Sequence, residues 1–259
     1  MGIGLPGEDF NSMWGTVFNV SAALEAAVNC GNVIGRDFHI PNIGKADSIE
    51  QLYENFETAV KYLLDICSAL YEKNAEISER SIPDPFVSLL TDDCIEKHCD
   101  RISGAKYHNV TVECMGMVNV SDGICAVDRL VFKDKKYTLE EISAAVKNNF
   151  EGYAELRQDI LACPKYGQNS SADEYAVRVA EITERIIRAK DHGNREYSPS
   201  LHTLDTNVGY GSNWGVGFDG RAAGTPFAKN AGCSNIARQS DPTSMVLSAA
   251  KLPQEKVFG

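Results

Sequence analysis

The sequence has no long apolar run, no excess of basic residues and no export signal, and each absence excludes a class of protein. No apolar run approaches the roughly 20 residues that cross a bilayer. The 36 Asp and Glu outnumber the 25 Lys and Arg, and the net charge of −11 disfavours nucleic acid and anionic membranes, since both need a basic face. The start lacks the basic and apolar segments of a signal peptide. We therefore expect a cytoplasmic protein without membrane or nucleic-acid partners.

The eight cysteines do not indicate a disulfide framework, because no export signal directs the chain to an oxidising compartment. With 43% hydrophobic residues among 259, the chain can bury a sizeable core instead. Cys94 and Cys99, with His98 and His108 nearby, could suggest a metal site, but structural zinc sites use tighter paired spacings. We expect buried or idle thiols and predict no metal ligands.

Helical periodicity, capping residues and breakers divide the chain into elements. Ser48 caps the longest apolar stripe, and Thr138 opens a capping box with Glu141. Residues 108–120 are β-branched and mostly apolar, which predicts a buried strand that runs into a helix near Ser121. Residues 193–242 are rich in glycine and predict loops and short strands. The predicted helices cover residues 22–31, 49–76, 86–99, 138–150, 173–190 and 244–251, and residues 153–157 extend or restart the fourth.

One glycine-rich motif, Gly215-Val216-Gly217-Phe218-Asp219-Gly220, has the spacing of a dinucleotide-binding loop, with Asp241 about twenty residues further on. Such a loop needs a helix after its third glycine, because the helix N-terminus holds the pyrophosphate. Residues 221–226 end in Pro226 and cannot continue a helix for two turns. The sequence therefore disfavours a dinucleotide site.

Three carboxylates are candidates for acid/base chemistry. Asp92 and Asp93 lie within the predicted helix 86–99, where paired acids could be catalytic or could occupy a solvated face. Glu113 is alone in a run of Val, Thr, Cys and Met, where burial is costly unless the carboxylate is paired or functional. Strand alternation could also point Glu113 outward. Both interpretations of Glu113 remain open.

Three aromatic residues, Trp14, Phe18 and Trp214, lie in stretches that read as loops. Aromatic side chains in such places could line a pocket, although core packing is the commoner role.

Several stretches together resemble a known family. In order along the chain, they are similar to segments of glycyl radical enzymes of the pyruvate formate-lyase type, and the match covers most of the sequence. The matching segments are residues 84–97 (DPFVSLLTDDCIEK), 104–107 (GAKY), 120–124 (VSDGI), 148–153 (NNFEGY), 164–167 (PKYG) and 219–226 (DGRAAGTP).

The resemblance implies an α/β fold, a helix-rich part of a large barrel with two antiparallel halves. Residues 1–259 would form one partial domain, with 1–192 mostly helical around a barrel strand near 108–120, and with 193–259 rich in loops. In this family a glycine-centred radical oxidises a cysteine to a thiyl, which takes a hydrogen atom from the substrate. A separate radical S-adenosylmethionine activating enzyme installs the radical.

Both radical-bearing loops of the family are missing from this sequence. The catalytic cysteine sits in a Gly-Cys-x-Glu loop, whereas Ser234 follows the only Gly-Cys pair here, Gly232-Cys233. The radical glycine sits in an Arg-Val-x-Gly motif, whereas Arg178-Val179 continues with Ala180. We expect no bound cofactor, a glycyl radical on a segment absent from this chain, and no activity of the chain alone. A polypeptide with the missing loops would be a partner.

The resemblance also implies positions for the substrate site. The segment that contains Trp14 and Phe18 follows the cysteine loop in the family and should lie close to the substrate. Glu113 falls on a barrel strand, where an acid suits a substrate whose hydroxyl or carboxylate shares a proton. His202 lies in a stretch that departs from the commoner family pattern. We expect a lyase for a small organic acid or alcohol, of decarboxylase, dehydratase or C–C lyase type; the alternative is a decayed or accessory protein that only binds a partner or small molecule.

Overall fold

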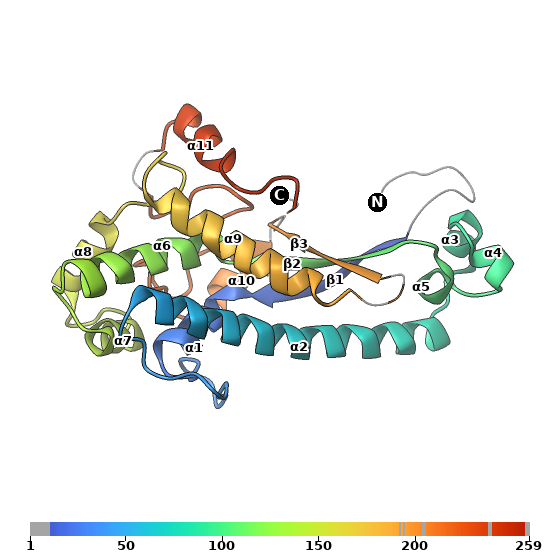
Figure 1. The fold of residues 1–259 in the computed structure, drawn as a ribbon, viewed down its shortest axis with the longest axis horizontal. Helices are drawn as coiled ribbons and strands as arrows, with labels where there is room; N and C mark the ends of the chain where they lie inside the picture. Colours follow the sequence, from blue (N-terminus) through green and yellow to red (C-terminus); the bar gives the residue numbers. More distant parts are fainter. Residues whose placement is uncertain are drawn as a thin grey trace.

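The computed structural model describes residues 11–191, 193, 195–201, 203, 206–237 and 240–256. At its centre is a parallel sheet with the strand order β1-β2-β3 (Figure 1), made of β1 (Asn11–Asn19), β2 (His108–Met115) and β3 (Arg195–Ser200). β2 confirms the strand predicted from residue 108. β1 corrects the loop expected around Trp14 and Phe18, because this stretch pairs with β2 along nearly its whole length.

Helices connect the strands and complete the fold. Between β1 and β2 lie α1 (Val20–Val28), α2 (Ile49–Ser81), α3 (Pro85–Leu90), α4 (Cys94–Lys97) and α5 (Arg101–Gly104). Between β2 and β3 lie α6 (Met117–Val127), the π-helical η1 (Asp128–Lys133), α7 (Leu139–Lys147), α8 (Ala154–Ala162) and α9 (Ala172–Arg188). After β3 come α10 (Thr206–Ser212) and α11 (Pro242–Ala249).

Local capping explains where the best-predicted helices begin. The Ser48 hydroxyl accepts a hydrogen bond from the Gln51 backbone N–H at 3.2 Å, and α2 starts at the next residue. At α7, both bonds of the capping box form between Thr138 and Glu141. These signals are local, so the sequence located both starts, although α2 ends five residues beyond the predicted end at residue 76.

The predicted helix 86–99 is wrong, because the chain breaks between α3 and α4. Asp93 has a φ of 71°, which no helix tolerates, and it precedes α4 as a left-handed cap. Asp92 lies in the intervening turn, where it forms an ion pair with Lys106 at 3.5 Å, and Asp93 pairs with Lys97 at 3.0 Å. The two acids therefore have separate basic partners.

Two further boundaries differ from the prediction. The helix after β2 begins at Met117 rather than near Ser121, because Gly116 has a φ of +79° and turns the chain directly out of the strand. In the segment predicted as loops and short strands, β3 is a short strand but α10 is a helix.

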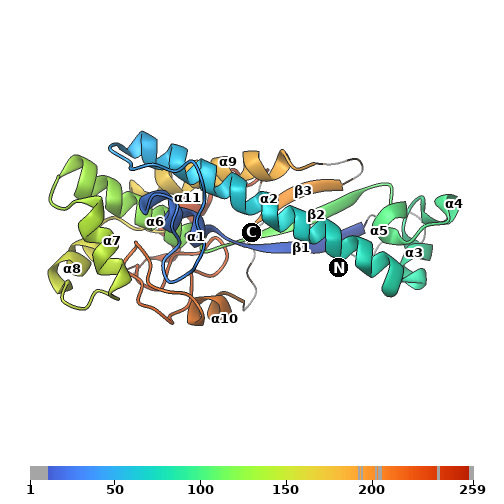
Figure 2. The same cartoon turned by 90° about the horizontal axis from the view of Figure 1, so that it is seen from below.

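One face of the sheet is covered by two long helices. α2 packs along β1 and α9 along β3, and the two helices also contact each other (Figures 1 and 2). Thr16, Val112 and Tyr197, one from each strand, meet Leu64 of α2 and Ile187 of α9 around a single small cavity. This side of the sheet is therefore packed like the core of a protein.

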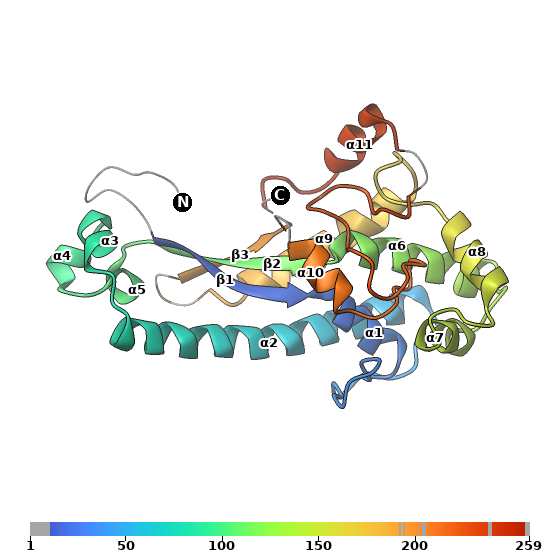
Figure 3. The same cartoon turned by 180° about the vertical axis from the view of Figure 1, so that it is seen from behind.

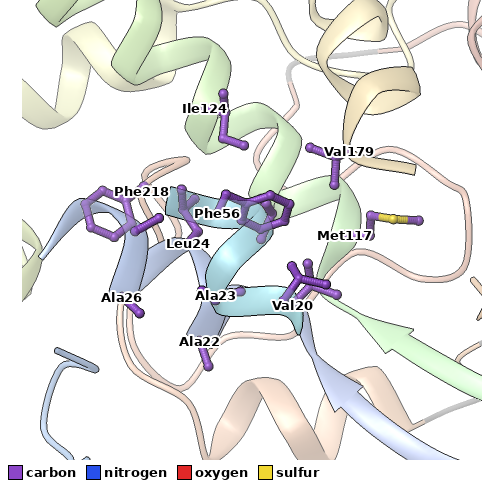
Figure 4. Packing of buried hydrophobic residues seen from close by; sticks show 14 of the residues in the cluster. Val20, Ala22, Ala23, Leu24, Ala26, Phe56, Met117, Ile124, Val179 and Phe218 are labelled. Carbon is purple, nitrogen blue, oxygen red and sulfur yellow. The ribbon is translucent and has the colours of Figure 1, made fainter. Parts of the chain in front are cut away.

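Part of the hydrophobic core lies where the strands end and the next helices begin. α1 packs against α2 and α6, and α6 packs against α9. Figure 4 shows Leu24 of α1, Phe56 of α2 and Ile124 of α6 together in this part of the core, and none of the three is more than 2% exposed. The core therefore fixes the carboxyl ends of β1 and β2 by way of the helices that follow them.

A β-bulge sets which residues of β1 share a face with β2. Trp14 pairs with Thr111 and Thr16 pairs with Val112, so Gly15 is an extra residue in β1. A Cβ on Gly15 would lie 2.4 Å from Val110 Cγ1 and 2.8 Å from the Thr111 carbonyl oxygen. Only glycine therefore lets β1 approach β2 this closely.

Candidate functional site

The second face of the sheet carries polar residues. Side chains alternate along a strand, so the neighbours of Val112 and Tyr197 face away from α2 and α9. In Figure 3 this face of β1 and β2 is seen without a helix in front of the strands, and α10 lies beside their carboxyl ends. A parallel sheet covered by helices on both faces would be apolar on both. This open face, as we call it, carries Val17 and Asn19 of β1, Thr111, Glu113 and Met115 of β2, and Ser198 and Ser200 of β3.

Glu113 lies at the centre of the open face. It pairs in register with Val17 of β1 and with Ser200 of β3. The Glu113 side chain is only 4% exposed, and its charge adds to the effect of burial that raises the pKa of the Cys114 thiol to about 12. The interpretation of Glu113 as a residue pointed into solvent is wrong, because the side chain is buried.

Of the other predicted site residues, only Phe18 has a side chain that the structure describes. Phe18 pairs with Cys114, lies on the helix-covered side of the sheet and is 1% exposed. Trp14 lies in β1 opposite Thr111, and the structure describes its backbone but not its side chain. His202 lies outside the described residues. Substrate contact by these three residues stays a prediction.

A buried acid that the sequence did not single out, Glu25, lies in α1, the helix that follows β1. It accepts hydrogen bonds from the Trp214 indole N–H at 2.9 Å and from the Ile34 backbone N–H at 3.0 Å. Burial raises the pKa of Glu25 to about 7, against the opposing effect of these donors. The Arg36 guanidinium lies over the Trp214 ring at 5.3 Å. Trp214 therefore joins the loop after α10 to α1.

A second polar network holds the same loop against α6. The Asn119 amide donates to the Asp219 carboxylate at 2.6 Å and accepts from the Ala228 backbone N–H at 2.8 Å. Arg221 is 2% exposed and donates to the Gly215 and Thr225 carbonyl oxygens, while its guanidinium stacks 4.4 Å from the Phe227 ring centre. Between this network and Glu25 remains a cavity of about 10 Å³. The segment 219–226 is thus part of the scaffold.

Asp122 of α6 is a further buried acid. It has no exposed surface, and it accepts hydrogen bonds from the Tyr166 backbone N–H at 2.7 Å and the Ser234 hydroxyl at 3.2 Å. Burial raises the pKa of Asp122 to about 8, although the nearby Lys165 charge opposes the shift. A lone Asp within the apolar α6 was the signal that could have found it in the sequence.

The remaining motifs do not build a second site. Turns rather than a helix follow Gly220, as the sequence predicted for the glycine-rich motif. Cys233, of the only Gly-Cys pair in the sequence, packs against Gly167. Over the described ranges, no three His, Cys, Asp or Glu side chains are grouped so that they could hold a metal ion. Nor is any helix in those ranges both long and apolar enough to span a bilayer.

Comparison with known proteins assigns the chain to a family. The sequence profile described as "Pyruvate formate lyase-like" matches residues 1–211. A trans-4-hydroxy-L-proline dehydratase of Clostridioides difficile is 28% identical over 82% of this chain and 27% of its own length. An isethionate sulfite-lyase of Oleidesulfovibrio alaskensis is also 28% identical, over 94% of this chain and 31% of its own.

A solved structure supports the same assignment. The crystal structure of a glycyl radical enzyme from Archaeoglobus fulgidus superposes with a TM-score of 0.85 at 26% identity, over 93% of this chain and 31% of that one. The sequence therefore spans about a third of the length of these relatives. The helix-rich α/β fold with its parallel sheet is that of glycyl radical enzyme barrels. The chain belongs to the pyruvate formate lyase-like family of glycyl radical enzymes.

Proposed function

We propose that this chain forms one wall of the substrate pocket of a glycyl radical lyase that acts on a small organic acid or alcohol. The observation that carries the proposal is the open face, where Glu113 is buried on a side of the sheet that α2 and α9 do not cover. The family membership supports the reaction class, because the relatives above are named as a dehydratase and a sulfite-lyase. Both names denote lyases that release a small molecule, so elimination from a hydroxylated substrate is the favoured reaction.

The role of Glu113 in this proposal is to accept or share a proton. The radical, when present, supplies hydrogen-atom abstraction at a substrate carbon, and that step requires near contact between the reacting atoms. A hydroxyl becomes more acidic next to a radical carbon, and a carboxylate within hydrogen-bond reach can then take its proton. Glu113 also places a negative charge beside the hydroxyl, which orients the O–H bond toward the carboxylate.

These 259 residues contain neither of the family's radical-bearing loops, so this function needs segments that carry them. The 259 residues include no Gly-Cys-x-Glu and no Arg-Val-x-Gly motif. We propose that polypeptide segments with these loops and a radical S-adenosylmethionine activating enzyme complete the catalyst, and that the chain alone is inactive. The chain itself would contribute the pocket wall and its fixed geometry.

The test is reconstitution of the radical without oxygen. The chain is combined with polypeptides that carry the two missing loops and with an activating enzyme, and electron paramagnetic resonance is recorded. We expect a glycyl radical signal, and small hydroxylated substrates are then screened for turnover. General acid/base groups contribute about 10²–10⁴-fold, so Glu113→Gln should lower kcat by a factor in that range and leave the radical signal intact.

Two outcomes would overturn the proposal. A reconstituted complex that never yields a radical signal with any pairing of loops would favour a protein that only binds a partner or small molecule. A radical signal accompanied by unchanged turnover in Glu113→Gln would remove Glu113 from the chemistry. Asp92→Asn is the matched control, because Asp92 pairs with Lys106 in a turn far from the open face and should leave kcat unchanged.

A further inference from the structure

Two cysteines, Cys94 and Cys99, flank a tight turn at the end of α4, which lies with α3 and α5 beside the carboxyl end of α2 (Figure 1). The turn contains His98, whose backbone is left-handed with a φ of 52°. The Cys99 backbone N–H donates to the Cys94 carbonyl oxygen at 3.2 Å. The His98 backbone N–H donates to the Ile95 carbonyl oxygen, also at 3.2 Å. These two hydrogen bonds form a Schellman motif, in which the side chains at the positions of Cys94 and Cys99 commonly touch.

The side chains of the two cysteines converge on Gly104 of α5. A Cβ on Gly104 would lie 3.0 Å from the Cys94 sulfur and 3.1 Å from the Cys99 β-carbon. Both side chains therefore pack on the same glycine, and one backbone hydrogen bond joins the two residues. A disulfide needs Cα atoms about 4.4–6.8 Å apart and Cβ atoms that approach each other. The turn and the shared contact with Gly104 bring Cys94 and Cys99 together in this way.

The two thiols differ in their access to solvent. Cys94 is 3% exposed, whereas Cys99 lies on the surface. Burial raises the pKa of the Cys94 thiol, and the nearby Asp100 carboxylate adds to the shift. The thiolate is the nucleophile in thiol–disulfide exchange, so both access and charge favour attack by Cys99 on an external reagent. Cys94 is then placed to react with the Cys99 sulfur from within.

We propose that Cys94 and Cys99 form a redox pair that closes to a disulfide by exchange with a small disulfide such as oxidised glutathione. Cys99 loses its proton, attacks one sulfur of the reagent and forms a mixed disulfide, and one glutathione thiolate leaves. Cys94 then loses its proton and attacks the Cys99 sulfur, which releases the second glutathione thiolate. The two protein thiols are oxidised by two electrons, the reagent is reduced to two thiols, and the two protons pass to the leaving thiolates.

Peptide mapping tests the pair directly, because Lys97 places a trypsin cleavage site between the two cysteines. The folded chain is equilibrated with mixtures of reduced and oxidised glutathione. Free thiols are then blocked with iodoacetamide in urea, and the tryptic peptides are identified by mass spectrometry. We expect the peptides of residues 81–97 and 98–101 to appear as one disulfide-linked species, whose share rises with the ratio of oxidised to reduced glutathione.

Single variants separate the roles of the two thiols. Cys94→Ser should abolish the linked species and leave Cys99 as a mixed disulfide, which adds the mass of one glutathionyl group to the peptide of residues 98–101. Cys99→Ser should abolish the linked species and leave Cys94 blocked by iodoacetamide. The matched control is Cys30→Ser, which removes an exposed thiol next to α1 and should leave the linked species unchanged. Circular dichroism of every variant verifies that the fold is kept.

The same titration in urea measures what the fold contributes. The turn at His98 and the contact with Gly104 hold the pair together only in the folded chain, so the unfolded chain should need a higher ratio of oxidised to reduced glutathione to form the linked species. A linked species that forms at the same ratio in both states would overturn the inference. So would its absence from the folded chain at every ratio, with Cys94 and Cys99 found separately.

Discussion

On one side of the three-stranded sheet, Val110 and Val112 pack against α2 and α9, whereas on the other side Thr111 and Glu113, their immediate neighbours in β2, face away from both helices. The backbone of β2 is the same for the two sets of residues. The difference lies in what covers each face, because both crossover connections place their long helices on one side (Figures 1 and 2).

Alternate residues of β2 therefore face two different surroundings, one apolar and one polar. The helix-covered side supplies apolar burial, which stabilises the fold by about 25 cal/mol for each Å² removed from water. The open face supplies a carboxylate and hydroxyls instead, to which the proposed function assigns the binding of a ligand. Substitutions on the two sides should therefore change different measured quantities.

The largest loss of stability should come from a substitution in the hydrophobic core that α2 forms with α1 and α6 (Figure 4). Phe56 of α2 is fully buried, so Phe56→Ala should lower the free energy of unfolding by about 3–5 kcal/mol, as other large cavities do. Urea denaturation of the chain measures this change. Leu70→Ala on the same helix, at a residue 61% exposed, should cost under about 1 kcal/mol. Equal losses for the two variants would contradict the assignment of the core.

A smaller loss of stability should follow when a side chain is added at Gly15, the extra residue of the β-bulge. Gly15→Ala places a Cβ against Val110 and the Thr111 carbonyl, so it should destabilise by about 1–3 kcal/mol, as in other overpacked sites. Gly44→Ala meets nothing within 4 Å and should be nearly neutral in the same denaturation experiment. Full stability of Gly15→Ala would show that β1 does not need this close approach.

The pH dependence of stability should reveal the buried carboxyl group of Asp122, which belongs to the scaffold and not to the open face. The folded state raises the pKa of Asp122 from 3.8 to about 8 by burial. Between these values the unfolded chain releases the proton while the folded chain keeps it, so stability falls as pH rises from about 4 to 8 and then levels off.

Asp122→Asn should remove this part of the pH dependence. The amide can keep both contacts, since its oxygen accepts from Tyr166 and its NH₂ can donate to the Ser234 hydroxyl. Because one pKa unit corresponds to 1.36 kcal/mol, the loss between pH 5 and pH 8 should be smaller in the variant by more than about 1 kcal/mol. Urea denaturation at both pH values measures it, and parallel curves for the two proteins would contradict the prediction.

The smallest change in stability should occur on the open face. Ser198→Ala should alter the free energy of unfolding by less than about 1 kcal/mol, because it removes a single hydroxyl and leaves no large cavity. Thermal and urea denaturation both report this quantity. A loss comparable to that of Phe56→Ala would mean that the open face is structural and would erase the contrast between the two sides.

Much of the helical structure could be predicted because its signals are local. Ser48 and Thr138 cap helices through residues three positions away, and the apolar stripe of α2 repeats along one segment. The strand of β2 was recognisable for a similar reason, since Val110, Thr111 and Val112 form a β-branched run within it. The break at Asp93 was missed because a left-handed cap can be occupied by an acid that otherwise fits a helix.

The sequence by itself determined the family, the main helices, the strand that carries Glu113 and the absence of both radical-bearing motifs from these 259 residues. Only the tertiary structure decided that residues 11–19 form β1, that Gly15 shifts its register, and that Glu113 is buried on the face away from α2 and α9. The physical reason is distance along the chain: caps and periodicity act within a few residues, whereas pairing of β1 with β2 joins positions almost a hundred residues apart.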